Sequence, residues 1–194
     1  MFRNLDLHKF SENLFLLGIF LLASAMSIGS ILILSSSIIS LFINKKKLFN
    51  DKWSLVLIFN SILLVIACFF QTYNYLNKDL YGWDISLTWI GLLNWIPFIF
   101  LFITSKNFLI TSRQRLKVAI YLFSGSIPVL ITGFGQYYFN WEGPLSIFNG
   151  VIVWYLKDIE PHLGLSGLFS NQNYAGTWLS MIWPFSLGFI YVNK

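Results

Sequence analysis

The residues best suited to acid–base chemistry lie in one short stretch, from Lys157 to His162. Within it, Glu160 and His162 are two positions apart, so a carboxylate and an imidazole could act as general base and general acid near neutral pH. A solvated loop explains the same residues, because one glutamate and one histidine without a third group do not make a catalytic arrangement. Both interpretations stay open, and Glu160 and His162 are the candidate catalytic residues.

Polar residues also gather just before the last apolar run. The segment from Gly164 to Phe185 reads GLSGLFSNQNYAGTWLSMIWPF, a glycine- and amide-rich turn that leads into an apolar helix. Loose backbone at membrane depth is tolerated only where protein buries it or where it lines a wet cavity. The candidate substrate-binding residues are therefore Ser166, Gly167, Asn171 and Asn173. Either asparagine is also suited to capping the following helix, and one can cap it while the other faces a cavity.

No metal or cofactor is predicted. The histidines are His8 and His162 and the single cysteine is Cys68, so a structural zinc site lacks ligands. Nucleotide-binding glycine motifs are missing from the sequence as well. The net charge of +5 comes from basic residues dispersed in short loops, which argues against a nucleic-acid partner.

Long apolar runs must position the polar residues. The chain is 56% hydrophobic and 11% charged, whereas soluble domains have about 25% charged residues. Runs of roughly 18 or more apolar residues can cross a bilayer. The predicted fold class is all-α, a polytopic membrane helix bundle of about five or six spans. The apolar runs are Leu14–Ile43, Trp53–Phe70, Ile85–Ile103, Val118–Gly135 and Tyr174–Val192.

The first run, Leu14–Ile43, is too long for one ordinary span and short for two. A bent hairpin, broken near Gly29 and its neighbouring serines, would put the N-terminus in the cytoplasm. One long tilted helix would put it outside. Arg3 and Lys9 favour the hairpin, since basic residues mark the cytoplasmic side.

Basic residues also predict which side each connection faces. The loops Asn44–Lys52 and Thr104–Lys117 hold eight of the thirteen lysines and arginines, which marks them as cytoplasmic. The stretches Gln71–Asp84 and Gln136–Asn173 contain one basic residue each and are predicted to lie outside. No apolar run contains Asp, Glu, Lys or Arg, which argues against an ion-driven transporter.

The predicted organisation is a set of transmembrane helices over residues 1–135, an extracytoplasmic loop over residues 136–173, and a further span over residues 174–194. Within the loop, Leu145–Leu156 is apolar but too short to cross, so it is predicted to be an interfacial or re-entrant segment that could form a lid. The outer aromatic side chains either form an interfacial belt or stack against sugar rings. They include Tyr73, Trp83, Trp141, Trp154 and Tyr155.

The polar segment resembles the motif of the O-antigen ligase and O-antigen polymerase family. That family has a run close to Arg-x-Ser/Thr-Gly-x-Phe-x-Asn-Pro-Asn, followed shortly by alanine, ahead of a span that contains a proline. Gly164 stands where the family has arginine, and Gln172 where it has proline. The matching residues are Ser166, Gly167, Phe169, Asn171, Asn173 and Ala175, with Pro184 in the following span.

The resemblance implies a membrane glycosyltransferase of O-antigen, lipopolysaccharide or other surface-polysaccharide assembly. Such a protein transfers or polymerises glycans from a polyprenyl diphosphate carrier at the periplasmic face of the bacterial inner membrane, so its partners are the bilayer and the polyprenyl diphosphate-linked glycan. Family members have more spans and a later periplasmic loop with basic residues. The chain is therefore expected to be an N-terminal portion, with residues 174–194 opening the family's conserved domain. It is expected to be inactive alone and to pair with a C-terminal half. Two alternatives stay open: a polysaccharide flippase or export component, and a non-catalytic membrane assembly subunit.

Overall fold

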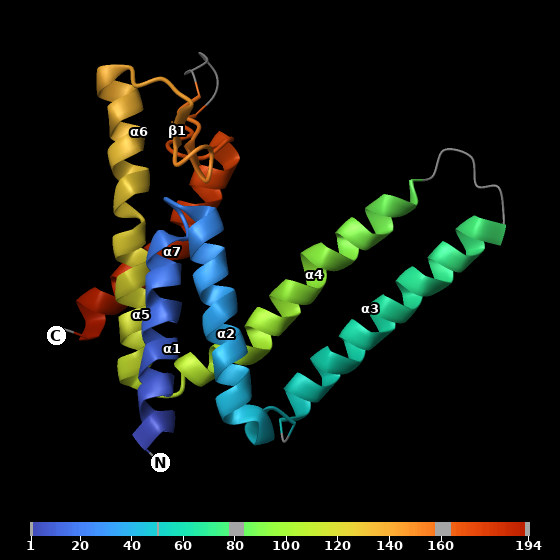
Figure 1. Ribbon diagram of the computed structural model, residues 1–194. Coiled ribbons are helices and arrows are strands. Elements are labelled where there is room, and N and C mark those ends of the chain that lie inside the picture. Colours follow the sequence, from blue (N-terminus) through green and yellow to red (C-terminus); the bar gives the residue numbers. More distant parts are fainter. Residues whose placement is uncertain (1, 50, 78–83, 158–163, 193–194) are drawn as a thin grey trace.

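The computed structural model describes residues 2–49, 51–77, 84–157 and 164–192. Helices make up most of this part of the chain, and its only strands form a small antiparallel hairpin (Figure 1). The predicted all-α class is therefore confirmed. The elements are α1 (Phe2–Leu21), α2 (Met26–Phe49), α3 (Lys52–Asn77), α4 (Ile85–Ser105), the short 3-10 helix η1 (Lys106–Phe108), α5 (Ser112–Gly125), α6 (Ile127–Phe139), β1 (Leu145–Ile147), β2 (Ile152–Trp154) and α7 (Gln172–Val192).

The chain is a multi-pass membrane helical protein. Four stretches of the described residues are long and apolar enough to cross a bilayer: Met26–Ile43, Lys52–Leu76, Ile85–Phe108 and Ser112–Phe139. The last of these joins α5 and α6, which follow one another nearly end to end with a break at Ser126 and with Pro128 in the first turn of α6 (Figure 1). Proline is tolerated there because its missing N–H has no partner in a first turn.

The first apolar run is a helical hairpin, as one of the two sequence alternatives predicted. The expected break near Gly29 is wrong, however, because the chain turns at residues 22–25 and Gly29 lies inside α2. A Cβ atom at Gly29 would stand 2.8 Å from the carbonyl oxygen of Gly18, and one at Gly18 would stand 2.6 Å from Ile33 Cγ1. Glycine is needed at these positions so that two helix backbones can approach closely, as small residues allow between membrane helices.

A glycine also allows close approach between α1 and α5. Together with Gly18 and Gly29 it forms a seam of small residues around α1. A Cβ atom at Gly125 would lie 2.5 Å from the carbonyl oxygen of Phe20. Nearer the other end of α1, the rings of Phe15 and Phe108 stack with centroids 4.3 Å apart. These contacts make α1 the centre of the bundle, with α2 on one side and α5 on the other (Figure 1).

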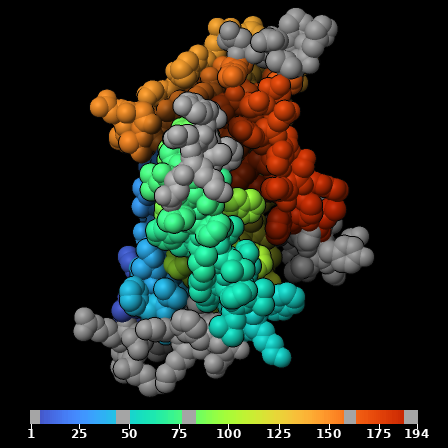
Figure 2. Space-filling view, turned by 90° about the vertical axis from the view of Figure 1, so that its right-hand side faces the viewer, coloured from blue at the N-terminus to red at the C-terminus, as the bar shows by residue number. Residues whose placement is uncertain are grey.

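Helices α3 and α4 form a second hairpin that leans away from the other helices (Figure 1). Most of its large apolar side chains are exposed, as a bilayer solvent permits. Figure 2 looks onto this side and shows α3 in front, with α7 standing at the right-hand edge.

The connections separate into two ends, as the charge pattern predicts. The N-terminus and the links from α2 to α3 and from α4 to α5 lie at one end (Figure 1). The turn between α1 and α2, the strands and the start of α7 lie toward the other end (Figure 1). At the basic end, Lys106 Nζ lies 2.7 Å from Asp51 Oδ2, and Lys117 Nζ lies 2.9 Å from Glu12 Oε1. Both ion pairs join segments that are distant in the sequence.

Candidate functional site

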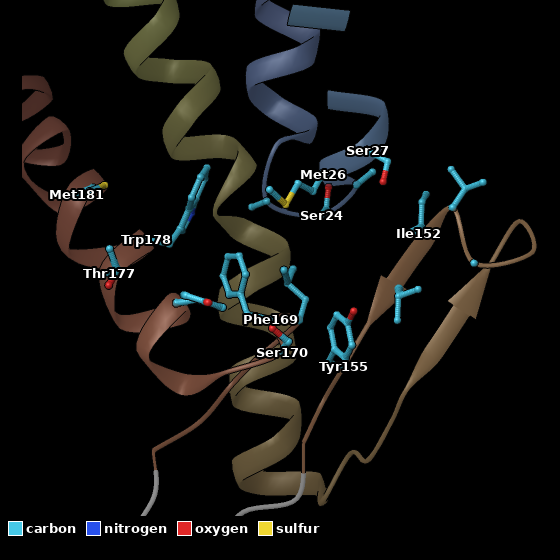
Figure 3. Close-up of a pocket in the computed structure, with 17 residues that line it drawn as sticks. Ser24, Met26, Ser27, Ile152, Tyr155, Phe169, Ser170, Thr177, Trp178 and Met181 are labelled. Carbon is cyan, nitrogen blue, oxygen red and sulfur yellow. The ribbon is translucent and has the colours of Figure 1, made fainter. Parts of the chain in front are cut away.

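A cavity of about 600 Å³ lies at the end of the molecule opposite the basic loops. This volume is within the range of small-molecule sites, roughly 300–1,000 Å³. Three parts of the chain form its walls: the turn between α1 and α2, the strand hairpin, and the segment that leads into α7 (Figure 3). The third wall consists of Leu168, Phe169, Ser170, Tyr174, Thr177, Trp178 and Met181, all from the segment that the sequence singled out.

The strand hairpin occupies the apolar stretch Leu145–Leu156, for which an interfacial or re-entrant segment was predicted. Leu145 pairs with Trp154 and Ile147 with Ile152. The turn has positive φ at Phe148, Asn149 and Gly150, and Asn-Gly between apolar residues is a strong hairpin signal because both residues tolerate that region. This signal was present in the sequence and identifies the hairpin. The segment covers one side of the cavity.

A buried glutamine holds the other side of the cavity in place. Gln136 of α6 is 1% exposed. Its Oε1 accepts a hydrogen bond from the Gly167 N–H at 2.6 Å, and its Nε2 donates to the Lys157 carbonyl at 2.8 Å and to Ser166 Oγ at 3.2 Å. One side chain therefore joins α6 to both ends of the stretch 157–166.

The polar segment also pairs with the chain that leaves β2. The N–H of Tyr155 donates to the Leu168 carbonyl at 3.2 Å, and the N–H of Leu156 donates to the Gly167 carbonyl at 3.2 Å. Gly167 has a φ of +56°, a conformation that favours glycine. A Cβ atom there would lie 3.3 Å from Thr132 Oγ1. Gly167 therefore allows both the turn and the close approach to α6.

Two tryptophans connect the cavity walls to other parts of the bundle through hydrogen bonds from their indole N–H groups. Trp154 of β2 donates from Nε1 to the Ser24 carbonyl at 2.7 Å, which ties the strand hairpin to the turn between α1 and α2. Trp178 of α7 donates from Nε1 to Ser126 Oγ at 3.0 Å, at the junction of α5 and α6. The Trp178 ring also packs against Phe169, with centroids 6.2 Å apart.

The predicted substrate-binding residues have different places in this arrangement. Ser166 and Gly167 are buried in the network around Gln136 and stand behind the cavity wall. Asn171 caps α7, because its Oδ1 accepts the N–H of Asn173 at 2.8 Å. Asn173 is exposed in the first turn of α7. Among the described residues that line the cavity, none of these four appears.

The candidate catalytic residues, Glu160 and His162, lie outside the described residues. The described residues hold no cluster of three or more histidine, cysteine or acidic side chains that could bind a metal ion.

Sequence reasoning did not identify Gln136, Phe169 or Trp178 as parts of a site. Gln136 directly follows an apolar run, and an amide in that position must find hydrogen-bond partners when it is buried. That signal indicates a hydrogen-bond network around Gln136 but does not identify the residues that bond to it. Tyr155 and Trp154 did appear among the outer aromatic residues, and Tyr155 lines the cavity.

The described lining of the cavity is uncharged. Its lining contains serine, threonine and tyrosine hydroxyls, aromatic rings, methionines and aliphatic side chains, and among the described lining residues there is no Asp, Glu, Lys, Arg or His. Such a wall can bind and orient a neutral ligand. It supplies no carboxylate or imidazole for proton transfer and no cation for a phosphate.

Comparison of the chain with protein-family models, with curated proteins and with solved structures finds no match.

Proposed function

We propose that the chain is a membrane glycosyltransferase-like protein of O-antigen or surface-polysaccharide assembly. In this proposal it handles a polyprenyl diphosphate-linked glycan at the periplasmic face of the bacterial inner membrane. The observation that carries the proposal is the position of the motif-like segment. Residues 168–181 supply one wall of the cavity, at the end opposite the basic loops.

The positive-inside rule supports the sidedness of this proposal. Basic residues concentrate in the two loops at one end of the bundle, which corresponds to the cytoplasmic side. The cavity then opens on the periplasmic side, where a lipid-linked glycan would be presented. Its position beside α7 also leaves the ligand within reach of the bilayer.

The residues have separate roles in the proposal. Tyr155, Phe169 and Trp178 contact the glycan, and Gln136, Ser166 and Gly167 keep the wall in place. Asn173, exposed in the first turn of α7, faces the approaching diphosphate, and the positive end of the helix dipole attracts anions. Glu160 and His162 remain the candidates for proton transfer.

The uncharged lining favours a second candidate, a non-catalytic assembly subunit. A diphosphate leaving group needs cations to stabilise it, and the described lining residues offer none. In both candidates a C-terminal half supplies the basic groups. The two differ in whether the reacting bond lies on this chain or only on its partner.

Photocrosslinking tests the proposed function. The full chain carries a benzophenone amino acid at Thr177, in the cavity wall, in bacterial membranes that contain radiolabelled polyprenyl diphosphate-linked glycan. We expect label on the protein after illumination. The same photoreactive residue at Thr72 of α3, outside the cavity, serves as the control. Absence of label at Thr177 in folded protein, or equal label at Thr72, would contradict the proposal.

Complementation tests whether this chain is sufficient for glycan transfer on its own. Expressed alone in strains that lack an O-antigen ligase or polymerase, the chain is expected to leave long-chain lipopolysaccharide absent on gels. Restored long chains would mean that the catalytic groups are all present in these 194 residues.

A further inference from the structure

The hydroxyl groups around the cavity differ from most others in this chain. Several serine and threonine hydroxyls donate to carbonyl oxygens one turn earlier, as at Ser36, Ser61, Thr72, Thr104, Ser126 and Thr132. The hydroxyls of Ser24, Ser27, Ser170 and Thr177 line the cavity, and within the described parts of the chain they form no hydrogen bond. They are therefore available to a ligand that has hydroxyl groups of its own.

Thr177 is the most informative of these residues. It lies in the second turn of α7, where a carbonyl oxygen one turn earlier is within reach of a threonine side chain. Its hydroxyl donates to no such carbonyl, and Thr177 is among the residues that line the cavity (Figure 3).

Aromatic rings stand on two walls of the same cavity. Trp178 and Phe169 come from the α7 side, and Tyr155 comes from the strand side (Figure 3). The hydrogen bond from Trp178 Nε1 to Ser126 Oγ, 3.0 Å long, fixes the indole before any ligand arrives. The C–H bonds of a pyranose form an apolar face that packs on such rings, while its hydroxyls project from the edge of the sugar.

The charge of the lining limits which sugars fit. Burial of a carboxylate or phosphate without a cation costs far more free energy than burial of a hydroxyl that finds a partner. The described lining residues include no basic side chain. A pure hydrocarbon ligand is also disfavoured, for a different reason. It would remove water from the free hydroxyls without replacing their hydrogen bonds.

We infer that the cavity is a subsite for an uncharged pyranose ring and that it excludes acidic sugars and the diphosphate. The inference rests on the proposed function for its link to a lipid-linked glycan. The specificity follows from the cavity itself: the rings hold the apolar face of the sugar, and the hydroxyls of Ser24, Ser170 and Thr177 bond to its hydroxyls. The diphosphate stays outside, toward the exposed start of α7.

Saturation-transfer NMR on the full chain in phosphatidylcholine nanodiscs tests the inference, with empty nanodiscs subtracted. The probes are methyl β-D-glucopyranoside, methyl β-D-glucuronopyranoside and 1-hexanol. We expect transfer to the ring protons of the glucoside and a signal at least about tenfold weaker for the glucuronide, since its carboxylate would be desolvated without a partner. Equal transfer to the two sugars would overturn the specificity, and displacement of the glucoside by hexanol would identify a hydrocarbon site instead.

Matched variants locate the binding. Thr177→Val and Ser170→Ala each remove a free hydroxyl at nearly constant volume and should weaken glucoside binding roughly two- to tenfold. Thr72→Val removes a hydroxyl outside the cavity and should leave binding unchanged. Ser27→Phe should narrow the cavity and weaken the signal. Unchanged binding in Thr177→Val, Ser170→Ala and Ser27→Phe, with thermal unfolding like that of the parent chain, would overturn the subsite.

The two proposals fail separately. Glucoside binding without crosslinking of the polyprenyl-linked donor would leave the sugar subsite standing and remove the glycan-transfer function. Crosslinking of the donor at Thr177 without glucoside binding would support the glycan-transfer function and remove the sugar subsite.

Discussion

Single residues link the cavity to the bundle, and Gln136 makes the largest number of these links. All of its amide partners belong to the stretch 157–167, so its side chain replaces water for several buried polar groups at once. A buried amide with all its bonds made stabilises one arrangement of the chain, whereas a partly bonded one destabilises it. The position of the cavity wall therefore depends on a residue outside the wall.

Gln136→Leu should destabilise the protein strongly. It leaves the buried Gly167 N–H without its acceptor and the Lys157 carbonyl without its amide donor, and each buried polar group left unsatisfied costs about 1–3 kcal/mol. Thermal unfolding in detergent measures the loss. Gln71→Leu, at an exposed position of α3, is the control. Equal melting temperatures for the two variants would show that the network contributes little.

The two asparagines before and within α7 should separate in their effects. Asn171→Ala removes the cap and should cost about 0.5–2 kcal/mol. Asn173→Ala, at an exposed position, should change stability by less than about 0.5 kcal/mol yet lower donor crosslinking per folded molecule. Membrane yield, unfolding temperature and crosslinking are measured together. Wild-type crosslinking in Asn173→Ala would leave this residue without a role in binding.

At the scale of elements, close backbone approach decides how the helices associate. Gly18 and Gly29 let α1 and α2 meet, and Gly125 lets α5 approach Phe20. In a bilayer the lipid is as apolar as the side chains, so van der Waals contact through small residues replaces the hydrophobic effect between helices. This seam holds the turn at residues 22–25 in position, and that turn is one wall of the cavity.

Gly29→Ala should destabilise the protein by about 1–3 kcal/mol, because overpacking forces the backbones apart. Gly91→Ala on α4 is the matched control, since no atom lies within 4 Å of its added Cβ. That variant should be neutral or more stable by up to about 1 kcal/mol. Unfolding temperatures in detergent compare them, and a similar response from both would remove the steric explanation.

The connection between α2 and α3 should respond to acid. Hydrogen bonds from Lys106 and Ser54 lower the pKa of Asp51 from its ordinary value of 3.8 to about 2. A lowered folded-state pKa means that this stabilisation is present above pH 3.8 and is lost as the pH falls through about 2. The unfolding temperature of the parent chain should exceed that of Asp51→Asn above pH 3.8, and this difference should disappear as the pH falls through about 2. Asp6→Asn is the comparison, and a difference that persists unchanged below pH 2 would contradict the assignment.

At the scale of the whole molecule, charge and architecture agree on a two-ended bundle. The basic loops share one end, and the cavity lies toward the other. Because Lys and Arg set orientation during insertion, the cavity should face away from the cytoplasm.

Cysteine labelling checks this orientation. In a Cys68→Ser background, a cysteine at Trp141 should react with a membrane-impermeant maleimide in intact spheroplasts. A cysteine at Arg113 should react only after permeabilisation. Both positions are exposed in the structure, so burial does not limit either reaction. The reverse pattern would place the cavity in the cytoplasm and exclude a periplasmic glycan substrate.

The sequence by itself determined the helices and predicted their sidedness, because apolar run length and basic loop charge are local properties. The run Ile85–Ile103 became α4 with the same first residue, and Tyr174–Val192 became α7 with the same last residue. The Asn149-Gly150 turn is also a local signal, but no hairpin was predicted from it. No local signal separates a glycine that breaks a helix from one that packs against another helix. The role of Gly29 was therefore mispredicted.

Only the tertiary structure decided which residues form the site. The walls come together through contacts such as Trp154 with Ser24, 130 positions apart, and Gln136 with Gly167, 31 positions apart. Ser166 and Gly167 have residue types suited to binding, yet their burial behind the wall depends on Gln136, whose partners the sequence cannot name. Asn171 caps α7 because its side-chain Oδ1 accepts the N–H of Asn173, a choice between two asparagines that only backbone geometry makes. Apolar pattern specifies which segments enter the membrane, whereas the packing of distant segments specifies what they enclose.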